Sequence, residues 1–573
     1  MGMDKREASY NLSAIRFSQE NLSAALLLLV DQARLAGMSK CVKHVNDISL
    51  NSRQASKSTA FIALKGAVGD GYDYIEDALK NGCSLILCEK PVSSSVLSQC
   101  IDSKGKRVCA VLVKSDLKQL LPDLLQQLYP QKTSLSNRIC AVTGTNGKTS
   151  VASFYAQLGL ALHEKNASLG TLGLNILARS ESFSNDEKQD AQHRQDHIED
   201  SNNTTPDIIT HHKVLALLQT HDVGSYCLEA SSHGLEQGRL QGLNINTAIF
   251  TNLSQDHLDY HQSMAAYGAA KRRLLNFDTL QHLILNADDP QSKVWQTHAR
   301  PSLKCLWYAT DKTNIPADAE FYCVANDISC TKDGLQFTLE STWGSTRINL
   351  ALLGRFNVAN YLAALSAHLI ESVQKSLPTA SDDGASHFAA LVKQSQRLSG
   401  VAGRMELFVG AKSRGNFIVD YAHTPDALAQ ALKASRAHTS GTLFCVFGCG
   451  GNRDKAKRKL MGEVAAQYSD SITLTEDNNR DESVESIIAD IKQGIDEQMQ
   501  MHNTSLSVHI EHDRKTAIVW TYEQSTPNDL ILLAGKGHEN YIEKQGERIH
   551  YSERKFAMSL CANTPKSLSG AIA

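Results

Sequence analysis

One stretch of the chain, AVTGTNGKTS at residues 141–150, ends like a phosphate-binding loop but is shorter than one. The usual pattern G-x-x-x-x-G-K-[ST] would have its first glycine at Val142. Glycines still let backbone N–H groups approach a polyphosphate, a lysine adds positive charge, and a hydroxyl can reach Mg²⁺. An apolar run precedes the loop and an apolar helical pattern follows it, so we expect nucleotide binding rather than a chance turn. The expected nucleotide-binding residues are Gly144, Thr145, Asn146, Gly147, Lys148, Thr149 and Ser150.

Two further polar clusters follow apolar runs. In EASSHGLEQGR, residues 229–239, the carboxylate of Glu229 can hold a metal ion, and the side chains of Ser231, Gln237 and Arg239 can hydrogen-bond an anionic substrate. In NLSQDHLDYH, residues 252–261, His257 can bind a metal or a phosphate. Taken alone each signal is weak, because a lone histidine is more often a polar residue with satisfied hydrogen bonds.

Short apolar runs rich in β-forming residues repeatedly stop at such polar or glycine-rich clusters, and helical patterns follow. This alternation indicates an α/β fold, in which ligands bind beyond the carboxyl ends of parallel strands. The expected strands lie in RICAVTG (138–144), SYCLEAS (225–231), TAIFTNL (247–253), NFIVDYAH (416–423), TLFCVFGCG (442–450), SITLTED (471–477) and LILLAGKG (530–537).

Composition limits the class of protein. The chain has 573 residues, 42% of them hydrophobic and 21% charged, with a net charge of −3. We therefore expect a soluble globular protein with no nucleic-acid partner and no membrane insertion. The 13 cysteines contain no C-x-x-C pair, and Cys445 and Cys449 flank a hydrophobic segment that suits buried thiols better than zinc. The amino-terminal residues contain no apolar signal segment, so we expect a cytoplasmic protein.

Two segments have loop-like composition. Residues 178–202 are charged and poor in aromatics, which is more typical of a solvated loop than of a partner-binding arm. Residues 375–386 form a second expected loop. Boundaries near residues 136 and 401 would divide the chain into domains at 1–136, 137–401 and 402–573.

Together these motifs resemble the Mur ligases, the ATP-dependent enzymes that add amino acids to the UDP-muramoyl precursor of bacterial peptidoglycan. The resemblance covers almost the whole chain, and the order and spacing of the motifs make it specific. It implies an N-terminal α/β uridine-nucleotide module, a central P-loop-type ATPase domain with a mainly parallel sheet, and a C-terminal Rossmann-like α/β domain. The motifs that carry it are TGTNGKTS, NTTPD (203–207), EASSHGLEQGR, NLSQDHLDYH, AYGAAK, GRFNVAN (354–360), AGRME (402–406), DYAHTPDAL (420–428), GCGGNRDKAKR (448–458) and AGKGHE (534–539).

The resemblance also implies a mechanism. A substrate carboxylate attacks the γ-phosphate of ATP, and an incoming amine captures the resulting acyl phosphate. Glu229 and a hydroxyl of Thr149 or Ser150 would hold one Mg²⁺, with His257 at a second. Lys271 of AYGAAK would carry a CO₂-derived carbamate that helps the second Mg²⁺, whereas the sequence alone favours a solvated helix lysine. In the same way Asn357 and Asp420 are expected at the ATP site.

The resemblance also implies contacts with the UDP-dipeptide at the residues that match the family's motifs. LNSR (50–53) implies contacts of Leu50 and Ser52 with UDP, although Ala67, Val68 and Gly69 stand where some relatives have a histidine in this loop. The expected remaining contacts with the UDP-dipeptide are Asn203, Thr204, Thr205, Ser231, Gln237 and Arg239.

EDNNRDE, residues 476–482, corresponds to the family's Asp-Asn-Pro-Arg signature, with Asn479 in place of proline. An arginine fork at Arg480 can bind the distal carboxylate of meso-diaminopimelate bidentately, whereas lysine offers no carboxylate there. An ordinary surface arginine is the alternative. The residues expected around the amino acid are Arg453, Asp477, Asn478, Asn479, Arg480, Gly535 and Glu539.

The sequence therefore predicts a monomeric ligase that joins meso-diaminopimelate to UDP-N-acetylmuramoyl-L-alanyl-D-glutamate, both small-molecule substrates, and uses ATP and Mg²⁺. Three alternatives stay open: the same reaction with L-lysine, a folate polyglutamate ligase, and a nucleotide-switched scaffold without ligase activity. NTTPD and SSHGLEQGR disfavour the folate enzyme. Amine-dependent release of ADP distinguishes a ligase from a scaffold.

Overall fold

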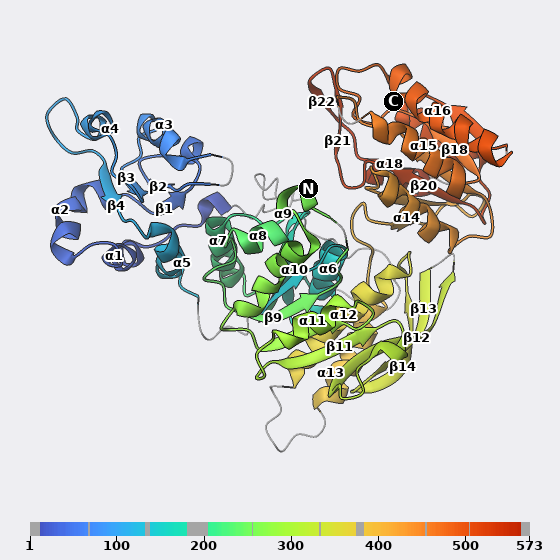
Figure 1. Cartoon of the computed structure of the whole chain (residues 1–573), viewed down its shortest axis with the longest axis horizontal. Helices are drawn as coiled ribbons and strands as arrows, with labels where there is room; N and C mark the ends of the chain where they lie inside the picture. The colour runs from blue at the N-terminus through green and yellow to red at the C-terminus, as the bar shows by residue number, and fades with distance from the viewer. Residues whose placement is uncertain are drawn as a thin grey trace, which may run out of the picture.

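A computed structural model describes residues 12–66, 69–131, 138–179, 204–254, 256–331, 334–373, 383–452, 455–503 and 505–562. These residues form three α/β units with separate sheets, as Figure 1 shows from the blue N-terminal unit to the orange C-terminal unit. The expected fold class is confirmed. The expected boundary near residue 136, most of the charged segment 178–202 and most of the loop 375–386 lie outside the described residues, as do Ala67 and Val68.

The N-terminal unit has a four-stranded, wholly parallel sheet in the order β1-β2-β3-β4. Its strands are short and almost entirely buried, which suits a parallel sheet covered by helices. The strands are β1 (Asp47–Ser49), β2 (Thr59–Ala63), β3 (Leu85–Cys88) and β4 (Ala110–Val113), and the helices are α1 (Gln19–Leu27), α2 (Gln32–Val42), α3 (Ile75–Lys80), α4 (Ser94–Gln99) and α5 (Leu117–Leu128).

The central unit has a ten-stranded sheet in the order β14-β13-β12-β11-β10-β9-β5-β8-β6-β7. Its middle strands are parallel, and antiparallel pairs close both edges. The strands are β5 (Arg138–Thr143), β6 (Lys165–Gly170), β7 (Gly173–Ala178), β8 (Ser225–Glu229), β9 (Ile245–Phe250), β10 (His282–Asn286), β11 (Lys304–Ala309), β12 (Phe321–Thr331), β13 (Gly334–Ser341) and β14 (Gly344–Leu350). The helices are α6 (Lys148–Gly159), α7 (Ile208–Thr220), α8 (Ser232–Glu236), α9 (Leu258–His261), α10 (Met264–Arg272), α11 (Gln291–Thr297), α12 (Phe356–Ser372) and α13 (Asp383–Ser395).

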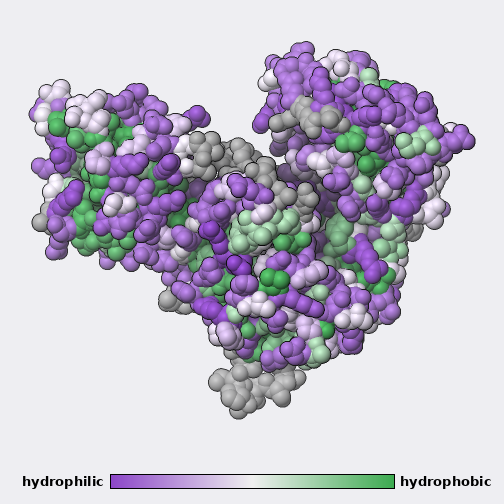
Figure 2. Space-filling view, viewed as in Figure 1, coloured by the Kyte–Doolittle hydropathy of each residue, from purple (hydrophilic) through white to green (hydrophobic). Residues whose placement is uncertain are grey.

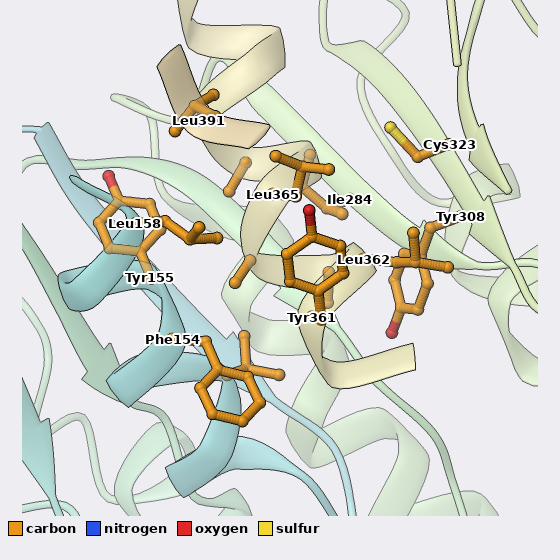
Figure 3. Packing of buried hydrophobic residues seen from close by; sticks show 14 of the residues in the cluster. Phe154, Tyr155, Leu158, Ile284, Tyr308, Cys323, Tyr361, Leu362, Leu365 and Leu391 are labelled. Carbon is orange, nitrogen blue, oxygen red and sulfur yellow. The ribbon is translucent and has the colours of Figure 1, made fainter. Parts of the chain in front are cut away.

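The core of the central unit fixes the helix that follows the phosphate loop. Phe154 and Leu158 of α6 pack against Tyr361 and Leu365 of α12 over one face of the sheet (Figure 3). All four side chains are almost completely buried. Because protein interiors are closely packed, this contact holds the N-terminus of α6 in one place relative to the strand ends.

The C-terminal unit has a six-stranded sheet in the order β15-β16-β20-β17-β18-β19, in which only β15 runs antiparallel to its neighbour. A separate antiparallel hairpin follows the last strand of this sheet. The strands are β15 (Glu406–Phe408), β16 (Asn416–Asp420), β17 (Leu443–Phe447), β18 (Ser471–Leu474), β19 (Ser507–Ile510), β20 (Leu530–Ala534), β21 (Tyr541–Lys544) and β22 (Glu547–His550). The helices are α14 (Pro425–Arg436), α15 (Ala456–Tyr468), α16 (Val484–His502), α17 (Arg514–Gln524) and α18 (Glu553–Ala562).

All seven runs expected as strands contain one, and each strand ends before its polar cluster or at the first residue of it. Figure 2 shows a largely hydrophilic surface with a wide opening between the N-terminal and C-terminal units, and α8, α9 and α10 lie on the side of the central unit toward this opening. In the described part of the chain, no helix is both long and apolar enough to cross a membrane.

Candidate active site

The phosphate loop joins β5 to α6, and its two glycines have backbone angles that other residues rarely adopt. Their φ angles are +146° at Gly144 and +89° at Gly147. A Cβ atom on Gly144 would lie 1.9 Å from the Thr251 hydroxyl, and one on Gly147 would lie 2.4 Å from the Asn360 amide oxygen. Only glycine fits these positions, so the loop backbone stays open to an anion at the N-terminus of α6.

The residues after β9 hold the loop in shape. The Thr145 N–H donates to the Asn252 carbonyl at 2.9 Å, and the Asn146 N–H donates to the Asn252 side-chain oxygen at the same distance. In return, the Thr251 hydroxyl donates to the Asn146 carbonyl at 2.6 Å. The loop is therefore preorganised, so a ligand would not have to order it.

Two lysines converge on one backbone carbonyl of the loop. Lys148 Nζ donates to the carbonyls of Gly144 and Thr145 at 2.9 and 2.8 Å, and Lys271 Nζ donates to the same Gly144 carbonyl at 2.8 Å. Lys271 is only 1% exposed and lies over the Tyr267 ring, so the alternative of a solvated lysine is wrong. Burial and then the charge of Lys148 lower the pKa of Lys271 to about 6. Burial also lowers the pKa of Lys148, against the opposing charge of Glu229.

Glu229 ends β8 as a buried carboxylate, 2% exposed. Its oxygens accept hydrogen bonds from the Thr171 N–H at 2.9 Å and from the Thr171 hydroxyl at 3.4 Å. Burial raises its pKa, and the Lys148 charge and a hydrogen bond from Thr149 oppose this rise. A carboxylate beside a loop hydroxyl fits Mg²⁺, which usually takes one or two carboxylates and completes its shell with phosphate oxygens and water. Within the described residues, no three or more histidine, cysteine, aspartate or glutamate side chains form a metal site by themselves.

His257 lies in a turn just before α9, with a φ angle of +51°, and its side chain is half exposed. The centroid of its ring lies 5.0 Å from that of His233 on α8. Its Nε2 atom lies 3.4 Å from Asp256 Oδ2. The buried His261 bonds the Ser232 hydroxyl at 2.9 Å and so ties α9 to α8. Sequence reasoning missed Asp256, His233 and His261, although the i, i+4 spacing of His257 and His261 could have pointed to the last of these.

The expected UDP-dipeptide residues of the central unit form one hydrogen-bonded network. The Thr205 hydroxyl donates to the Glu229 carbonyl at 2.7 Å and also bonds the Ser231 hydroxyl at 2.9 Å. Arg239 donates to the Thr205 carbonyl at 2.6 Å and to the Gln237 side chain at 3.0 and 2.6 Å. Through Thr205, this network is joined to the end of the strand that carries Glu229.

Of the four other residues expected to contact the UDP-dipeptide, the three that the structure describes are not part of this network. Thr204 accepts a hydrogen bond from the Thr171 hydroxyl at 3.2 Å, whereas Asn203 lies outside the described residues. In the N-terminal unit Leu50 is 36% exposed, and the buried Ser52 accepts through its carbonyl from Asn81 at 2.9 Å. Leu50 is thus open to a ligand, whereas Ser52 supports the turn after β1.

The two remaining nucleotide candidates lie on either side of the junction between the central and C-terminal units. Asn357 accepts from Asn360 at 2.9 Å, and Asn360 is the residue packed against Gly147. Asp420 ends β16 and accepts the Met405 N–H at 2.7 Å. Burial raises the Asp420 pKa, and Arg404 is among the groups that oppose this rise. Arg404, which sequence reasoning missed, also contributes positive charge at Lys148 and Glu229.

A third cluster lies at the end of β18, where Lys536 is fully buried among acidic and amide groups. Its Nζ pairs with Asp477 at 3.1 Å and Glu539 at 3.1 Å, and it donates to the Asn478 side chain at 2.7 Å. Asn478 also donates to Glu539 at 2.9 Å. Burial alone would raise the pKa of Asp477, but the charges of Lys536 and Arg514 outweigh it and lower the pKa. Sequence reasoning missed Lys536, although it stands inside AGKGHE.

The turn after this cluster carries Arg480, at a φ angle of +49°. Its guanidinium pairs through Nε with Glu543 at 3.1 Å and donates through Nη1 to the Gly451 carbonyl at 2.9 Å. Gly535, at a φ angle of +110°, faces Asp477, whose carboxylate oxygen would lie 2.8 Å from an added Cβ. Arg480 is thus a partly buried, paired arginine, and its contact with a substrate stays a prediction. Arg453 lies outside the described residues.

Comparison with known proteins places all three units. Models described as the Mur ligase family catalytic domain, the Mur ligase middle domain and the Mur ligase glutamate ligase domain match residues 44–129, 142–368 and 403–537. A relative from Vibrio vulnificus (strain YJ016), named UDP-N-acetylmuramoyl-L-alanyl-D-glutamate--2,6-diaminopimelate ligase, is 35% identical over 544 residues, which cover 94% of this chain and 98% of the relative. The ligase of the same name from Haemophilus influenzae (strain 86-028NP) is 34% identical, covering 90% of this chain and 96% of the relative.

A solved structure described by the same ligase name is 34% identical, with a TM-score of 0.61, covering 90% of this chain and 94% of that one. MurF from Acinetobacter baumannii has a TM-score of 0.56 at 15% identity, covering 92% of this chain and 98% of that one, and shows a shared fold alone. The family matches and the identity over nearly the full length lead to one conclusion. The chain belongs to the Mur ligase family, and it is an ATP-dependent, ADP-forming peptide ligase of peptidoglycan precursor synthesis.

Proposed function

We propose that this ligase joins meso-diaminopimelate to UDP-N-acetylmuramoyl-L-alanyl-D-glutamate. The observation that carries the choice of amine is the Arg480 guanidinium next to the polar cluster of Asp477, Asn478 and Glu539. A guanidinium fork suits the distal carboxylate of the amino acid, and the acidic and amide groups suit an ammonium. The names of the two relatives support the same substrates.

In this proposal the phosphate loop and Lys148 bind the transferring phosphate of ATP. Lys148 exchanges its bonds with the Gly144 and Thr145 carbonyls for phosphate oxygens and neutralises the charge that develops there. The terminal carboxylate of the UDP-dipeptide attacks the γ-phosphate, releasing ADP and giving an acyl phosphate. The bound amine then attacks the acyl carbon, forms the amide and displaces phosphate. Mg²⁺, when held by Glu229 and the Thr149 or Ser150 hydroxyl, with His257 at a second ion, supplies further charge neutralisation. Asn357 and Asp420 complete the proposed nucleotide site.

Lys271 is proposed to carry the carbamate. Only a neutral amine reacts with CO₂, and a pKa near 6 leaves the Lys271 amine neutral at physiological pH. The carbamate reverses the charge of the side chain, which a neighbouring divalent cation favours and which also removes the repulsion from Lys148. The buried position beside the Gly144 carbonyl keeps the group at the phosphate loop.

Thr204 and the network of Thr205, Ser231, Gln237 and Arg239 are proposed to orient the peptide end of the UDP-dipeptide. Leu50 and Ser52 are proposed to meet the uridine. Arg239 supplies the positive charge that an anionic substrate needs. The network reaches Glu229 through Thr205, so the carboxylate to be activated would be held near the proposed Mg²⁺ ligand. We place the domain boundaries near residues 136 and 401.

The decisive experiment measures ADP release with the UDP-dipeptide and a panel of amino acids, in the wild type and in Arg480→Ala. We expect release that depends on meso-diaminopimelate, with L-lysine a poor substrate. Arg480→Ala should raise the KM for diaminopimelate by roughly thirtyfold or more, the scale of losing one partner of a charge-assisted pair. A wild-type preference for L-lysine, or an unchanged KM in the variant, would contradict the choice of amine. ADP release that is independent of any amine would contradict the ligase reaction itself.

A further inference from the structure

The hairpin of β21 and β22 is joined by its backbone to the turn that carries Arg480. The Arg480 N–H donates to the Glu543 carbonyl at 3.0 Å, and the Gln545 N–H donates to the Arg480 carbonyl at 2.9 Å. These bonds place Arg480 opposite Lys544 in a short parallel bridge. The turn and the hairpin therefore behave as one small sheet, although they are far apart in the sequence. Asn478, just before Arg480, and Glu539, just before the hairpin, are 61 residues apart and are hydrogen-bonded to each other.

Side chains strengthen this connection on both sides of the turn. The Glu543 N–H donates to the Asn478 side chain at 2.9 Å, and Lys544 pairs with the buried Glu476 at 2.6 Å. Arg480 itself has a φ angle of +49°, a conformation that a residue other than glycine adopts only when its surroundings impose it. The preceding residue is Asn479 rather than a proline, so the chain itself does not restrict φ there. The hairpin instead restrains the next residue, Arg480, through hydrogen bonds to its backbone N–H and carbonyl.

The side chain of Glu543 acts on the guanidinium directly. Its Oε2 lies 3.1 Å from Arg480 Nε, and the Gly451 carbonyl accepts from Nη1 at 2.9 Å. The ion pair at Nε and the hydrogen bond at Nη1 lie on different edges of the planar guanidinium, so together they restrain both its position and its rotation. Each of the two charged side chains is about one-fifth to one-quarter exposed, at 21% and 24%, so solvent screens their pairing only in part.

We propose that Glu543 is a positioning residue for the amine substrate, which sets the orientation in which Arg480 presents its fork to the distal carboxylate of a diamino dicarboxylic acid. This inference rests on the proposed function. Glu543 does not bind the amino acid itself in this account; it lowers the cost of ordering a long, flexible side chain before the substrate arrives. Loss of Glu543 should therefore weaken amine binding and leave the other two substrates unaffected.

An ordinary surface ion pair would behave differently. Exposed pairs contribute little, so removing one would change neither stability nor kinetics measurably. A purely structural role would lower the melting temperature and change the kinetic constants of all three substrates together. A positioning role changes one KM selectively, and its effect disappears when Arg480 is already absent.

The test compares Glu543→Ala, Glu543→Gln and the matched control Glu547→Ala, an exposed carboxylate of the same hairpin. For each variant, kcat and the KM values for meso-diaminopimelate, ATP and the UDP-dipeptide are measured, together with the melting temperature. We expect Glu543→Ala to raise the KM for diaminopimelate about fivefold, the upper end of the scale for an ion pair that solvent partly screens, with the other constants unchanged. Glu543→Gln should recover only part of the affinity, because it keeps the size of the side chain and a polar oxygen near Arg480 Nε but loses the charge of the ion pair. Glu547→Ala should match the wild type.

A double variant separates this inference from the proposed function. Arg480→Ala with Glu543→Ala should be no worse than Arg480→Ala alone, because Glu543 acts through Arg480. Additive losses, an unchanged KM in Glu543→Ala, or a parallel change in all three KM values would each overturn the positioning role. If Glu543→Ala has no effect while Arg480→Ala still loses diaminopimelate, only this inference fails. If the wild type prefers L-lysine, the choice of amine fails and the positioning role fails with it.

Discussion

At the scale of single residues, the unusual feature is the approach of Lys148 and Lys271 to one carbonyl oxygen. Two ammonium groups in one buried site repel each other and are poorly solvated, so one of them is better accommodated as a neutral amine. Lys271 is the more deeply buried of the two, and its pKa falls to about 6. The site thus provides a neutral amine at the position where we propose that the carbamate forms.

Replacing Lys271 tests this account. Lys271→Ala should lose at least about a hundredfold in turnover, the scale of removing one preorganised charge-stabilising group. Short carboxylates such as formate or acetate should restore part of the activity by taking the place of the carbamate. Turnover is measured by ADP release with and without each carboxylate, and the exposed Lys293→Ala serves as control. Full activity of Lys271→Ala would contradict the role of Lys271. So would an equal stimulation of Lys293→Ala by acetate, because that variant keeps Lys271.

At the scale of elements, the approach of β6 to β8 places the buried carboxylate of Glu229. Gly170 ends β6, and a Cβ atom there would lie 1.9 Å from Glu229 Oε1. Both are interior strands of the sheet and pair with each other in parallel, so neither can move away without breaking the ladder. Glycine is therefore needed at position 170 because any side chain would collide with the Glu229 carboxylate, and not because of its backbone angles.

Gly170→Ala should displace Glu229 from the loop and raise the Mg²⁺ concentration needed for half-maximal activity. We expect an increase of about tenfold or more, since partners that hold a metal ligand commonly contribute ten- to a hundredfold in metal affinity. The control is Gly37→Ala on α2, where an added Cβ meets no atom within 4 Å. Mg²⁺ titrations of ADP release on both variants decide the matter. Equal Mg²⁺ requirements would show that Glu229 is not a ligand.

Sequence patterns predicted those elements whose signal is local. Apolar runs that stop at polar clusters located the strands that carry Glu229 and Asp420, because both the run and its end are written in consecutive residues. Lys536 and His261 were missed because their importance comes from partners on other elements. The antiparallel strands β12 to β14 were missed as well; β12 is largely half-buried and the edge strand β14 is largely exposed, so both carry weak periodicity. Roles that depend on contacts between distant segments need the fold.

The turn between β18 and α16 offers an element-scale prediction at Asn479. Within the described residues its backbone N–H donates no hydrogen bond, and its buried Oδ1 has no partner. Replacing Asn479 with proline therefore removes the unsatisfied side-chain oxygen and reduces the conformational freedom of the unfolded chain. It also removes one hydrogen bond, from Asn479 Nδ2 to the Glu482 carbonyl at 3.2 Å. We expect Asn479→Pro to stabilise the protein by up to about 1 kcal/mol and to keep or lower the KM for the amine. A large drop in melting temperature would show that this turn needs the asparagine.

At the scale of the whole molecule, one buried histidine of the C-terminal unit bonds two backbone groups of the central unit. His438 follows α14, and its Nε2 accepts the Gly354 N–H at 2.8 Å, while its Nδ1 bonds the Thr331 carbonyl at 2.6 Å. Nε2 accepts only when it carries no proton, so the hydrogen bonds assign the neutral ring with the proton on Nδ1. Leu353, next to Gly354, packs into the core of the C-terminal unit. The junction is thus made by a histidine that must stay neutral.

Acidification should therefore loosen this junction. Burial lowers the pKa of His438, and the hydrogen bond to the Thr331 carbonyl opposes this shift. At pH values between the lowered pKa of the folded protein and the ordinary value of 6.5, the unfolded chain therefore binds more protons than the native protein. The stability that depends on neutral His438 is fully present above that ordinary value and is lost as the pH falls through the folded pKa. His438→Ala leaves the Gly354 N–H without its partner and should cost about 1–3 kcal/mol at neutral pH.

The difference between wild type and His438→Ala should then shrink in mild acid, because the wild type loses what the variant already lacks. Denaturant unfolding at neutral and acidic pH measures it, with the exposed His44→Ala as control. Other buried histidines, such as His368, also destabilise the protein in acid, but they do so equally in both proteins and cancel in the difference. A difference that stays constant with pH would mean that His438 contributes by packing alone, and that protonation does not control how the two units are held together.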